Sequence, residues 1–493
     1  MKKLTTYLSF LLIFIILLSF SLTGCNGGDD TSDDASGNTG SGDLVPHLGK
    51  ADYSGKTLRV LASLENDVFG DAQIAPEEFN SEPVNDAVVE RNRRLEGEYG
   101  FNIEVIYAPD FDKFTDRVRQ DMMSGSDDYD VISSGLMYLA PLVVDGLLLD
   151  LKTIEDSHLK LDEDWWDTAS NKDMSIGNKL FFTTGDIFVL DDENTRLTYF
   201  NKDLIDEYGL DNPYDLVKEG KWTLDNMYKM MKAVAHEDGD GVMNVTGDDV
   251  WGLVGGAFEA YQYILGCNCP QIYKDEDDIP YLGMVEEKSV NAFMKVFDMF
   301  TDKSTVAYIE QYYKWDDPDA PTVTDNFYSG NALFYAAFMF TVNNEKMRES
   351  SINYGVLPQP KYDENQENYA STVNPYRFYC LSITEAAQDL DFITFALEAM
   401  AYTSKEIVTP EYYDRTLKLK RFDDSASPEM LDIIFSNRIV DLSVVFNWAD
   451  CIQWYNRMLF GNNNGIVSYV EAQKEMFDTQ MEATLDSIFR HEQ

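Results

Sequence analysis

Short apolar runs and amphipathic segments alternate along the chain from Lys50 onward. Period-two or continuous apolar patterns predict strands, and charged amphipathic patterns predict helices between them. The predicted strands are 57–62, 102–107 and 129–133, and the predicted helices are 85–99 and 111–123. Strands separated by helices of this length are typical of βαβ units on a parallel sheet, whose ligand sites lie at the carboxyl ends of the strands. Those ends are 63–67, 107–110 and 133–138.

The N-terminus has the pattern of a secretion signal. Lys2 and Lys3 precede an almost unbroken apolar run over 4–22, which ends in the sequence Leu-Thr-Gly-Cys at 22–25. The run alone is long enough for an uncleaved membrane anchor, but the tetrad resembles the lipobox of bacterial lipoproteins. We therefore predict a signal peptide over 1–24, and lipid (palmitate among its chains) on Cys25. This places the protein on the extracellular face of the cell membrane.

The segment after the lipobox predicts a flexible tether over 25–49. It is rich in Gly, Ser, Asp and Thr and cannot bury enough apolar surface to fold. No later segment has an apolar run long enough to span a bilayer, so we expect the rest of the chain to lie outside the membrane.

Composition and charge restrict the class of partner. A chain of 493 residues with 44% hydrophobic residues should hold two or three packed units. It carries 39 Lys and Arg against 87 Asp and Glu, a formal net charge of -48. Such a surface repels phosphate backbones, so nucleic acid is excluded as an expected partner. Four cysteines remain besides Cys25, and they are too few for a disulfide framework. Cys267, Cys269, Cys380 and Cys451 are expected to be buried small side chains, with one bridge left as an alternative.

Several segments together resemble an extracellular solute-binding protein of an ABC importer, of family 1 and carbohydrate type. The segments are LVVDGLLLDL at 142–151, GNKLFF at 177–182, LTYFNKDL at 197–204, FYSGNAL at 327–333 and YGVLPQP at 354–360. The similarity covers residues 55–405 in the order of the family.

This resemblance implies an α/β fold of the periplasmic-binding-protein type, with two lobes joined by hinge crossover strands. The expected first lobe is 50–182 with 371–422, and the second is 183–370 with 423–493. It also implies ABC permease subunits as partners and a monomeric receptor.

Catalytic motifs are missing from the sequence. There is no G-x-S-x-G, H-E-x-x-H, G-x-x-x-x-G-K-[ST] or C-x-x-C, and only four histidines occur. Asp191, Asp192 and Glu193 could supply a glycosidase pair, but 87 acidic residues produce such runs by chance. We expect a binding protein and not an enzyme.

Seven tryptophans and 29 tyrosines favour a carbohydrate ligand, because aromatic faces pack on the C–H side of a sugar ring. Trp222 is the exception, since Thr223 after it is the expected N-cap of a helix. For Arg196 and Arg377, a role as inter-lobe or surface ion-pair partners is an equal alternative. If both faced the cleft, they would favour an anionic ligand, because the planar guanidinium group matches a carboxylate. The expected ligand-binding residues are Glu65, Asn66, Tyr138, Asn194, Arg196, Arg377 and Trp448.

An acidic loop after a predicted helix at 224–235 partly matches a calcium site. A calcium-binding loop has oxygen ligands at positions 1, 3, 5, 7, 9 and 12 and Gly at position 6. With Asp240 at position 5, Gly241 falls at position 6 and Asn244 at position 9, but positions 1 and 12 do not carry the required ligands. Some relatives of the family carry calcium at this place. The expected ligands are Asp238, Asp240, Asn244 and Asp248, and a solvated glycine-rich turn is the default.

Two alternatives to carbohydrate import stay open. One is a receptor for a peptide or another polar solute. The other is a cell-surface hydrolase or carbohydrate-attaching lipoprotein without transport. The sequence does not name the sugar, because specificity depends on a few hydroxyl contacts.

Overall fold

The structure is a computed structural model that describes residues 43–63, 74–76, 78–108, 111–188, 190–312, 322–413 and 425–490. The predicted signal peptide with its lipobox, Cys25, Glu65 and Asn66 lie outside the described residues. No helix within the described ranges has the length and apolar character that a membrane-spanning segment needs.

The first lobe is built on a four-stranded sheet of order β12-β3-β1-β2. Its strands are β1 (Thr57–Ser63), β2 (Asn102–Ala108), β3 (Val131–Gly135) and β12 (Tyr379–Ile383). β1 pairs in parallel with β2 and β3, as the alternation of strands and helices predicts. β12 is antiparallel to β3 and comes from a much later part of the chain, after the whole sheet of the second lobe. The predicted third strand, 129–133, begins two residues later, at Val131, and the carboxylate of Asp130 just before it pairs with Arg59 of β1.

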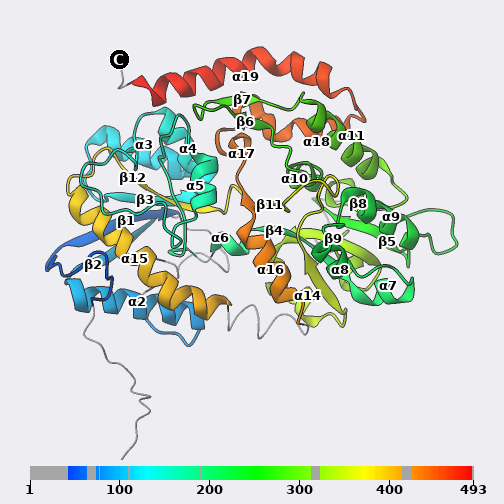
Figure 1. The fold of residues 1–493 in the computed structure, drawn as a ribbon, viewed down its shortest axis with the longest axis horizontal. Coiled ribbons are helices and arrows are strands. Elements are labelled where there is room, and N and C mark those ends of the chain that lie inside the picture. Colours follow the sequence, from blue (N-terminus) through cyan, green and yellow to red (C-terminus); the bar gives the residue numbers. More distant parts are fainter. Residues whose placement is uncertain are drawn as a thin grey trace, which may run out of the picture. The chain divides into compact units, whose positions relative to one another are not determined.

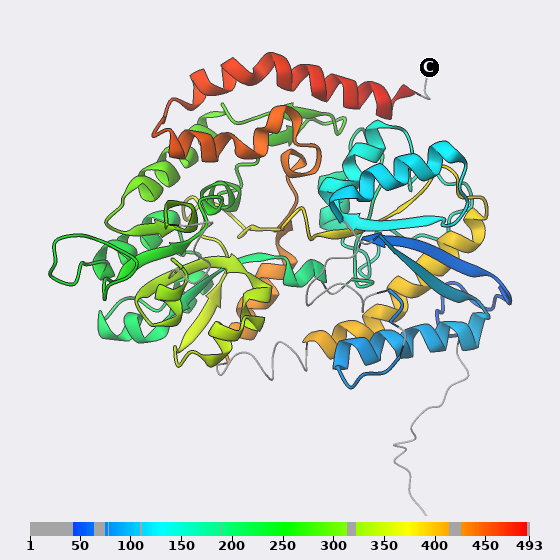
Figure 2. The ribbon, with the colours of Figure 1, turned by 180° about the vertical axis from the view of Figure 1, so that it is seen from behind.

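Helices cover both faces of this sheet (Figure 1). They are α2 (Pro83–Tyr99), α3 (Phe114–Ser124, after the 3-10 turn Phe111–Lys113), α4 (Leu136–Val144) and α15 (Leu390–Pro410). α2 begins where the Glu82 side chain accepts from the Asn85 amide, and ends at Gly100, whose φ of 79° is left-handed. α2 and α15 pack side by side, and Figure 2 shows them from behind. Their core contains Tyr99 and Phe395, with ring centroids 4.9 Å apart.

The second lobe is built on a five-stranded mixed sheet of order β10-β4-β9-β5-β8. Its strands are β4 (Arg196–Asn201), β5 (Trp251–Gly255), β8 (Val306–Tyr308), β9 (Ala332–Phe338) and β10 (Tyr354–Leu357). β5 is parallel to β8 and β9, whereas β4 is antiparallel to β9 and β10. The surrounding elements are α7 (Lys202–Glu207), α8 (Pro213–Lys218), α9 (Leu224–Val234), α10 (Glu259–Gly266), α11 (Glu287–Thr301), α12 (Ile309–Tyr312), α13 (Asp325–Tyr328), the 3-10 turn Met339–Asn343, α14 (Glu345–Glu349) and a hairpin of β6 (Ile272–Lys274) and β7 (Pro280–Leu282).

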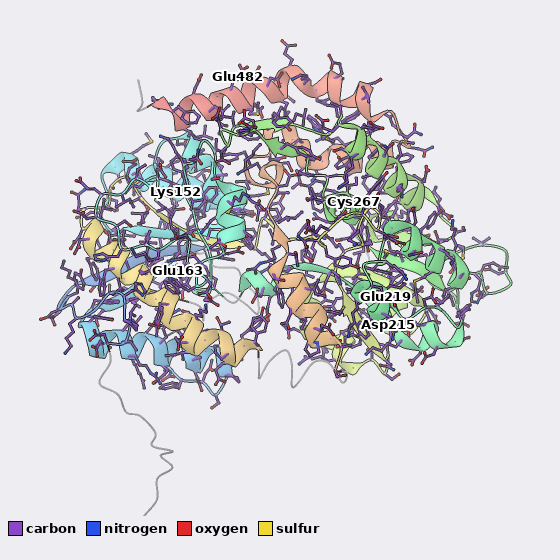
Figure 3. The ribbon with its side chains drawn as sticks, in the orientation of Figure 1. Lys152, Glu163, Asp215, Glu219, Cys267 and Glu482 are labelled. Atoms are coloured by element: carbon purple, nitrogen blue, oxygen red, sulfur yellow. The ribbon has the colours of Figure 1, made fainter. Side chains whose placement is uncertain are left out.

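Trp222 has the structural role that the sequence predicts. It is fully buried, donates its indole N–H to the Pro358 carbonyl at 2.9 Å, and packs on Phe334. Thr223 accepts a hydrogen bond from the Asn226 amide and so caps α9, as predicted. Within the described ranges, Cys267, Cys269, Cys380 and Cys451 are buried thiols that are in no disulfide, and Cys267 is labelled inside the second lobe in Figure 3.

The chain crosses between the lobes several times. The crossing elements are α6 (Leu190–Glu193), β11 (Ser371–Thr372) and β13 (Arg438–Ile439), and α5 (Thr168–Met174) of the first lobe packs against β13. β11 pairs with β13, and isolated bridges join Thr183 to Leu381 and Thr195 to Val373. The crossing segments are therefore tied to one another by backbone hydrogen bonds near the centre of the molecule, as the hinge of the predicted fold requires.

The last part of the chain contacts both lobes. It consists of α16 (Ser427–Ser436), α17 (Leu442–Phe446), the 3-10 segment Trp448–Gln453, α18 (Trp454–Phe460) and α19 (Ile466–Ile488). α19 packs against the 3-10 segment and α11 of the second lobe, and against α4 of the first. Near its end, Ser487 donates to the Val144 carbonyl at 2.6 Å. The C-terminal helices thus bridge the lobes, while the lobe boundaries stay a prediction.

A buried carboxylate, Glu398 of α15, organises one side of the first lobe. Its two oxygens lie within 3.0 Å of His47 Nε2, the Lys160 amide and the indole nitrogens of Trp165 and Trp166. Residues 43–49, which the sequence assigns to the tether, pack on this lobe through such contacts, and Val45 is fully buried. One side chain therefore holds three segments that are distant in sequence.

We expect Glu398→Ala to lower the free energy of unfolding by about 3–5 kcal/mol, because it leaves several buried donors without an acceptor. Glu406→Ala, an exposed position on the same helix, is the matched control and should change it by less than about 0.5 kcal/mol. Urea unfolding monitored by circular dichroism measures both variants. Equal stabilities of the two variants would contradict this role of Glu398.

Candidate functional site

The carboxyl ends of the strands define the candidate site. In the first lobe, β1, β2 and β3 end at Ser63, Ala108 and Gly135. In the second lobe, β5, β8 and β9 end at Gly255, Tyr308 and Phe338, and Arg196 at the start of β4 lies opposite Phe338. These ends are where α/β sheets bind ligands.

Residues 374–377 contact the strand ends of both lobes. The Pro375 carbonyl accepts from the Met137 amide just after β3, at 3.2 Å, and the Asn374 amide donates to the Asn194 carbonyl at 3.1 Å. Gly135 is required at this contact, because a Cβ there would lie 2.1 Å from the Tyr376 carbonyl oxygen. The segment therefore joins the end of β3 to the residues just before β4, and it places Tyr376 and Arg377 between the two lobes.

Aromatic rings form the wall on the side of the first lobe. Tyr138 is half-buried, and its ring packs edge-on against Phe111 at 5.6 Å and lies 6.3 Å from the ring of Tyr376. The Tyr138 hydroxyl lies 3.4 Å from a carboxylate oxygen of Asp112. Tyr376 is 46% exposed, so part of its ring is available to a ligand. Burial, and then the charge of Asp450, raise the pKa of its hydroxyl, which therefore stays a neutral donor.

The second lobe contributes a buried ion pair covered by aromatic rings. Arg196 and Glu259 at the start of α10 are both buried and are paired with each other. The Arg196 guanidinium lies 4.1 Å from the ring centre of Phe338 and 5.3 Å from that of Phe258. Burial raises the pKa of Glu259, and the charge of Arg196 opposes that shift. The positive charge of Arg196 is therefore matched by a buried ion pair within the second lobe, whereas the alternative that the sequence leaves open is an inter-lobe or surface pair.

Arg377 and Asn194 lie beside this wall. The Arg377 guanidinium is 5.6 Å from the ring of Phe340, which stacks on Phe338 at 5.1 Å. Asn194 is 3% exposed, and its backbone supports the segment 374–377. The structure thus brings together Tyr138, Asn194, Arg196 and Arg377. Sequence reasoning missed Tyr376, Phe338, Phe340 and Glu259, although Tyr376 stands next to the expected ligand residue Arg377.

Trp448 is expected from the sequence to bind the ligand, but the structure buries it away from the candidate site. It is 2% exposed, stacks on Phe446 with centroids 5.1 Å apart at 5°, and packs edge-on against Phe477 of α19. Its indole N–H donates to Thr484 at 2.9 Å. Because these side chains cover the ring, it has no open face for a sugar, and we assign Trp448 to the packing of α19.

The acidic loop of the calcium prediction lies between α9 and β5. Asp238 and Asp240 are exposed, and together with Glu237 they offer oxygens within 4.8 Å of one another. The carboxylate of the buried Asp249 accepts from the amides of Asp238 and Asn244, at 2.8 and 2.5 Å. Asp248 donates its amide toward Asp238 at 3.4 Å. These bonds describe a tight, acidic turn, and calcium stays a prediction for it.

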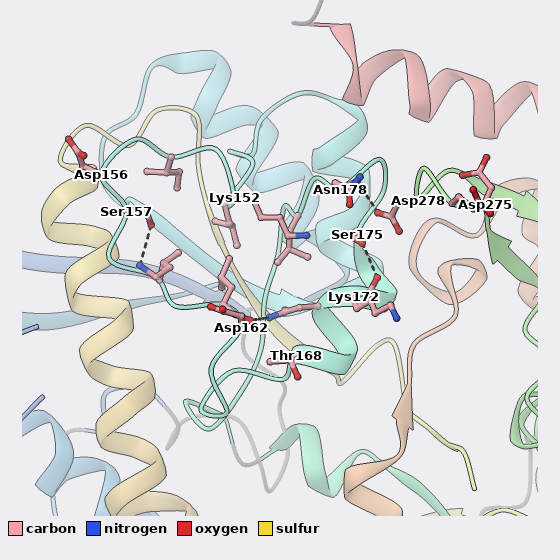
Figure 4. Close-up of a pocket in the computed structure, with 17 residues that line it drawn as sticks. Lys152, Asp156, Ser157, Asp162, Thr168, Lys172, Ser175, Asn178, Asp275 and Asp278 are labelled. Carbon is pink, nitrogen blue, oxygen red and sulfur yellow. Dashed lines mark hydrogen bonds between the residues drawn. The ribbon is translucent and has the colours of Figure 1, made fainter. Parts of the chain in front are cut away.

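A hollow of about 840 Å³ lies elsewhere, between the loop 151–162, α5 and the turn of the β6–β7 hairpin (Figure 4). Leucine and isoleucine side chains line it together with Lys152, Lys172, Asp275 and Asp278. Asp278 accepts from the Asn178 amide at 2.9 Å, and Lys274 donates to the Ser175 carbonyl at 3.1 Å. None of the expected ligand residues lines this hollow, and its described lining has no aromatic ring, so we do not place the site there.

Solved structures of other proteins share the fold of this chain. The sugar-binding protein MalE from Xanthomonas citri is 16% identical, with a TM-score of 0.56 over 89% of this chain and 100% of that one. An ABC substrate-binding protein from Listeria monocytogenes in complex with cycloalternan is 13% identical, with a TM-score of 0.52 over 86% and 99%. UgpB from Mycobacterium tuberculosis in complex with glycerophosphocholine is 14% identical, with a TM-score of 0.53 over 82% and 97%.

A search of curated proteins finds no match to this chain. The family described as bacterial extracellular solute-binding protein matches residues 81–401, which is more than half of the chain. The match includes the strand ends β2, β3, β5, β8 and β9 and the segment 374–377. The resemblance expected from the sequence is therefore confirmed, and the chain belongs to the family of bacterial extracellular solute-binding proteins.

Proposed function

We propose that this protein is the carbohydrate receptor of an ABC importer, anchored by lipid on Cys25. It captures a mono- or oligosaccharide between its lobes and delivers it, as a monomer, to the permease subunits. The observation that carries the proposal is the set of aromatic rings at the strand ends, with Tyr376 46% exposed between the lobes. One of the similar structures is described as a sugar-binding protein and another is in complex with cycloalternan, and this supports the same ligand class.

A neutral ligand fits this site better than an anionic one. The charge of Arg196 is matched by Glu259, so this arginine presents no unmatched charge to an anion at the wall of the second lobe. Asp112, whose carboxylate lies 3.4 Å from the Tyr138 hydroxyl, disfavours a further negative charge. This argues against a phosphodiester such as the glycerophosphocholine bound by UgpB, although the folds are similar.

Binding should depend on Tyr376. We expect a saccharide from a panel of neutral oligosaccharides to raise the melting temperature and to change tryptophan fluorescence, because a ligand bound only by the folded protein stabilises it. Tyr376→Ala should weaken that binding by about 1–3 kcal/mol, through the lost ring face and its burial. Met123→Ala, at a position 88% exposed outside the site, is the control and should bind as wild type does. If peptides or glycerophosphodiesters bound and no saccharide did, the proposed carbohydrate ligand would be wrong.

The ion pair of Arg196 and Glu259 should contribute more to the free energy of unfolding than to the affinity for the ligand. Arg196→Ala leaves a buried carboxylate without its partner, and we expect the free energy of unfolding to fall by about 3–5 kcal/mol. The charge-free double variant Arg196→Met with Glu259→Gln should recover most of this loss, and should bind the saccharide more tightly than Tyr376→Ala does. Chemical denaturation and calorimetric titration measure the two effects. A double variant that is stable but binds no saccharide would contradict a structural role for the pair.

The lipid anchor depends on one thiol. We expect Cys25→Ala to abolish labelling with radioactive palmitate and to shift the protein away from the cell surface or leave the signal uncleaved, since no other residue can accept the lipid at the lipobox. Cys380→Ala, a buried thiol in the first lobe, is the control and should stay labelled. A Cys25→Ala protein that is still labelled and membrane-bound would refute the anchor.

A further inference from the structure

Another hollow, of about 570 Å³ and lined by tyrosines, lies on the second lobe and shares no residue with the candidate site. Three tyrosines and the first residues of α11 line it. The lining residues are Tyr273, Tyr281, Glu286, Glu287, Lys288, Asn291 and Tyr362. Tyr273 and Tyr281 are paired across the β6–β7 hairpin, so the hollow is built on regular structure.

The two hairpin tyrosines form a fixed aromatic platform. Their rings are stacked, with centroids 5.9 Å apart and planes 27° apart. Tyr273 is held in place by its hydroxyl, 3.2 Å from Ser289 Oγ, and by Gly283, where a Cβ would lie 1.9 Å from the Tyr273 ring. Tyr281 is 42% exposed. One ring thus supports the other, and the outer ring stays open to solvent.

Polar groups around the platform are available for hydrogen bonding. Glu286, Glu287 and Asn291 are exposed, and among the described residues their side chains make no hydrogen bond or ion pair. Carboxylate oxygens accept from hydroxyl groups, and an amide both donates and accepts. An open aromatic face with such groups at its edge matches a sugar ring, whose C–H face is apolar and whose rim carries hydroxyls.

Charges of both signs surround the hollow and favour an uncharged ligand. The ring of Tyr362 already faces Lys295 at 4.6 Å and Lys288 at 5.9 Å, so an organic cation would meet two ammonium groups at that ring. An anion would meet the carboxylates of Glu286 and Glu287, which also line the hollow. An uncharged ligand with many hydroxyls meets neither conflict.

We propose that this hollow is a second carbohydrate site, which holds a neutral polysaccharide or long oligosaccharide on the outside of the second lobe through stacking on Tyr281. It lies apart from the site between the lobes and goes beyond the proposed import function. A shallow surface site of this kind would keep a long chain near the protein while a shorter saccharide occupies the strand ends.

The test is affinity electrophoresis of the full chain in native gels that contain soluble starch, mixed-linkage β-glucan, arabinoxylan or galactomannan. We expect at least one polysaccharide to retard the wild-type protein. Tyr281→Ala should lower that affinity about tenfold, whereas Tyr281→Phe, which keeps the ring, should retain it. Because Tyr281 is exposed, unchanged melting temperatures should show that the variants fold. Tyr281→Ala retarded as strongly as wild type, or no retardation of wild type by any of the four polymers, would overturn the proposal.

Two further arms separate this site from the one between the lobes. Tyr376→Ala should still be retarded by the polysaccharide, and Tyr281→Ala should still bind a short saccharide by its fluorescence signal. Failure of short saccharides to bind would reject the proposed import function and leave the retardation result standing. Tetramethylammonium chloride that abolishes retardation at low millimolar concentration, where sodium chloride does not, would identify a cation site and reject the carbohydrate assignment.

Discussion

The arrangement of the two lobes depends on one buried positive charge, the guanidinium of Arg438. It is 11% exposed and pairs with Asp167 at 2.8 Å and with Asp192 at 2.6 Å. Asp167 caps the start of α5, Asp192 lies on the crossing segment α6, and Arg438 begins β13. Burial raises the pKa of Asp192 to about 6, and the charge of Arg438 opposes that shift. A buried guanidinium that requires two carboxylates at fixed places holds three separate segments in register.

The candidate site depends on this arrangement, because its walls come from different lobes. Tyr138 and Phe111 belong to the first lobe, and Phe338 and Phe340 to the second. Residues 374–377 are the structural link between them, since the same short segment contacts both the end of β3 and the residues just before β4. The site is therefore made of surfaces that each lobe buries poorly by itself, which is the usual place for ligand sites in proteins of two lobes.

The sequence predicts the elements and the family well, because these depend on local patterns. The strands at the start of the first lobe, the helices between them and the cap at Thr223 all follow from periodicity and from side-chain chemistry. Long-range packing is invisible to such patterns. The expected cleft position of Trp448 fails because Phe477 of α19, a separate helix further along the chain, covers its ring. Glu259, the partner of Arg196, is 63 residues away in sequence, so neither segment by itself predicts that the charge of Arg196 is neutralised by an ion pair.

The contacts of α19 and of the β6–β7 hairpin limit how the lobes can move. Ser487 ties the end of α19 to the first lobe, and Lys274 and Asp278 tie the hairpin to residues 172–178. In Figure 1, α19 and the β6–β7 hairpin lie at the top, above β11 at the centre. While these ties hold together with the central crossings, the lobes can rotate only about an axis that runs near both sets of contacts, so closure on a ligand is a rotation about a single axis.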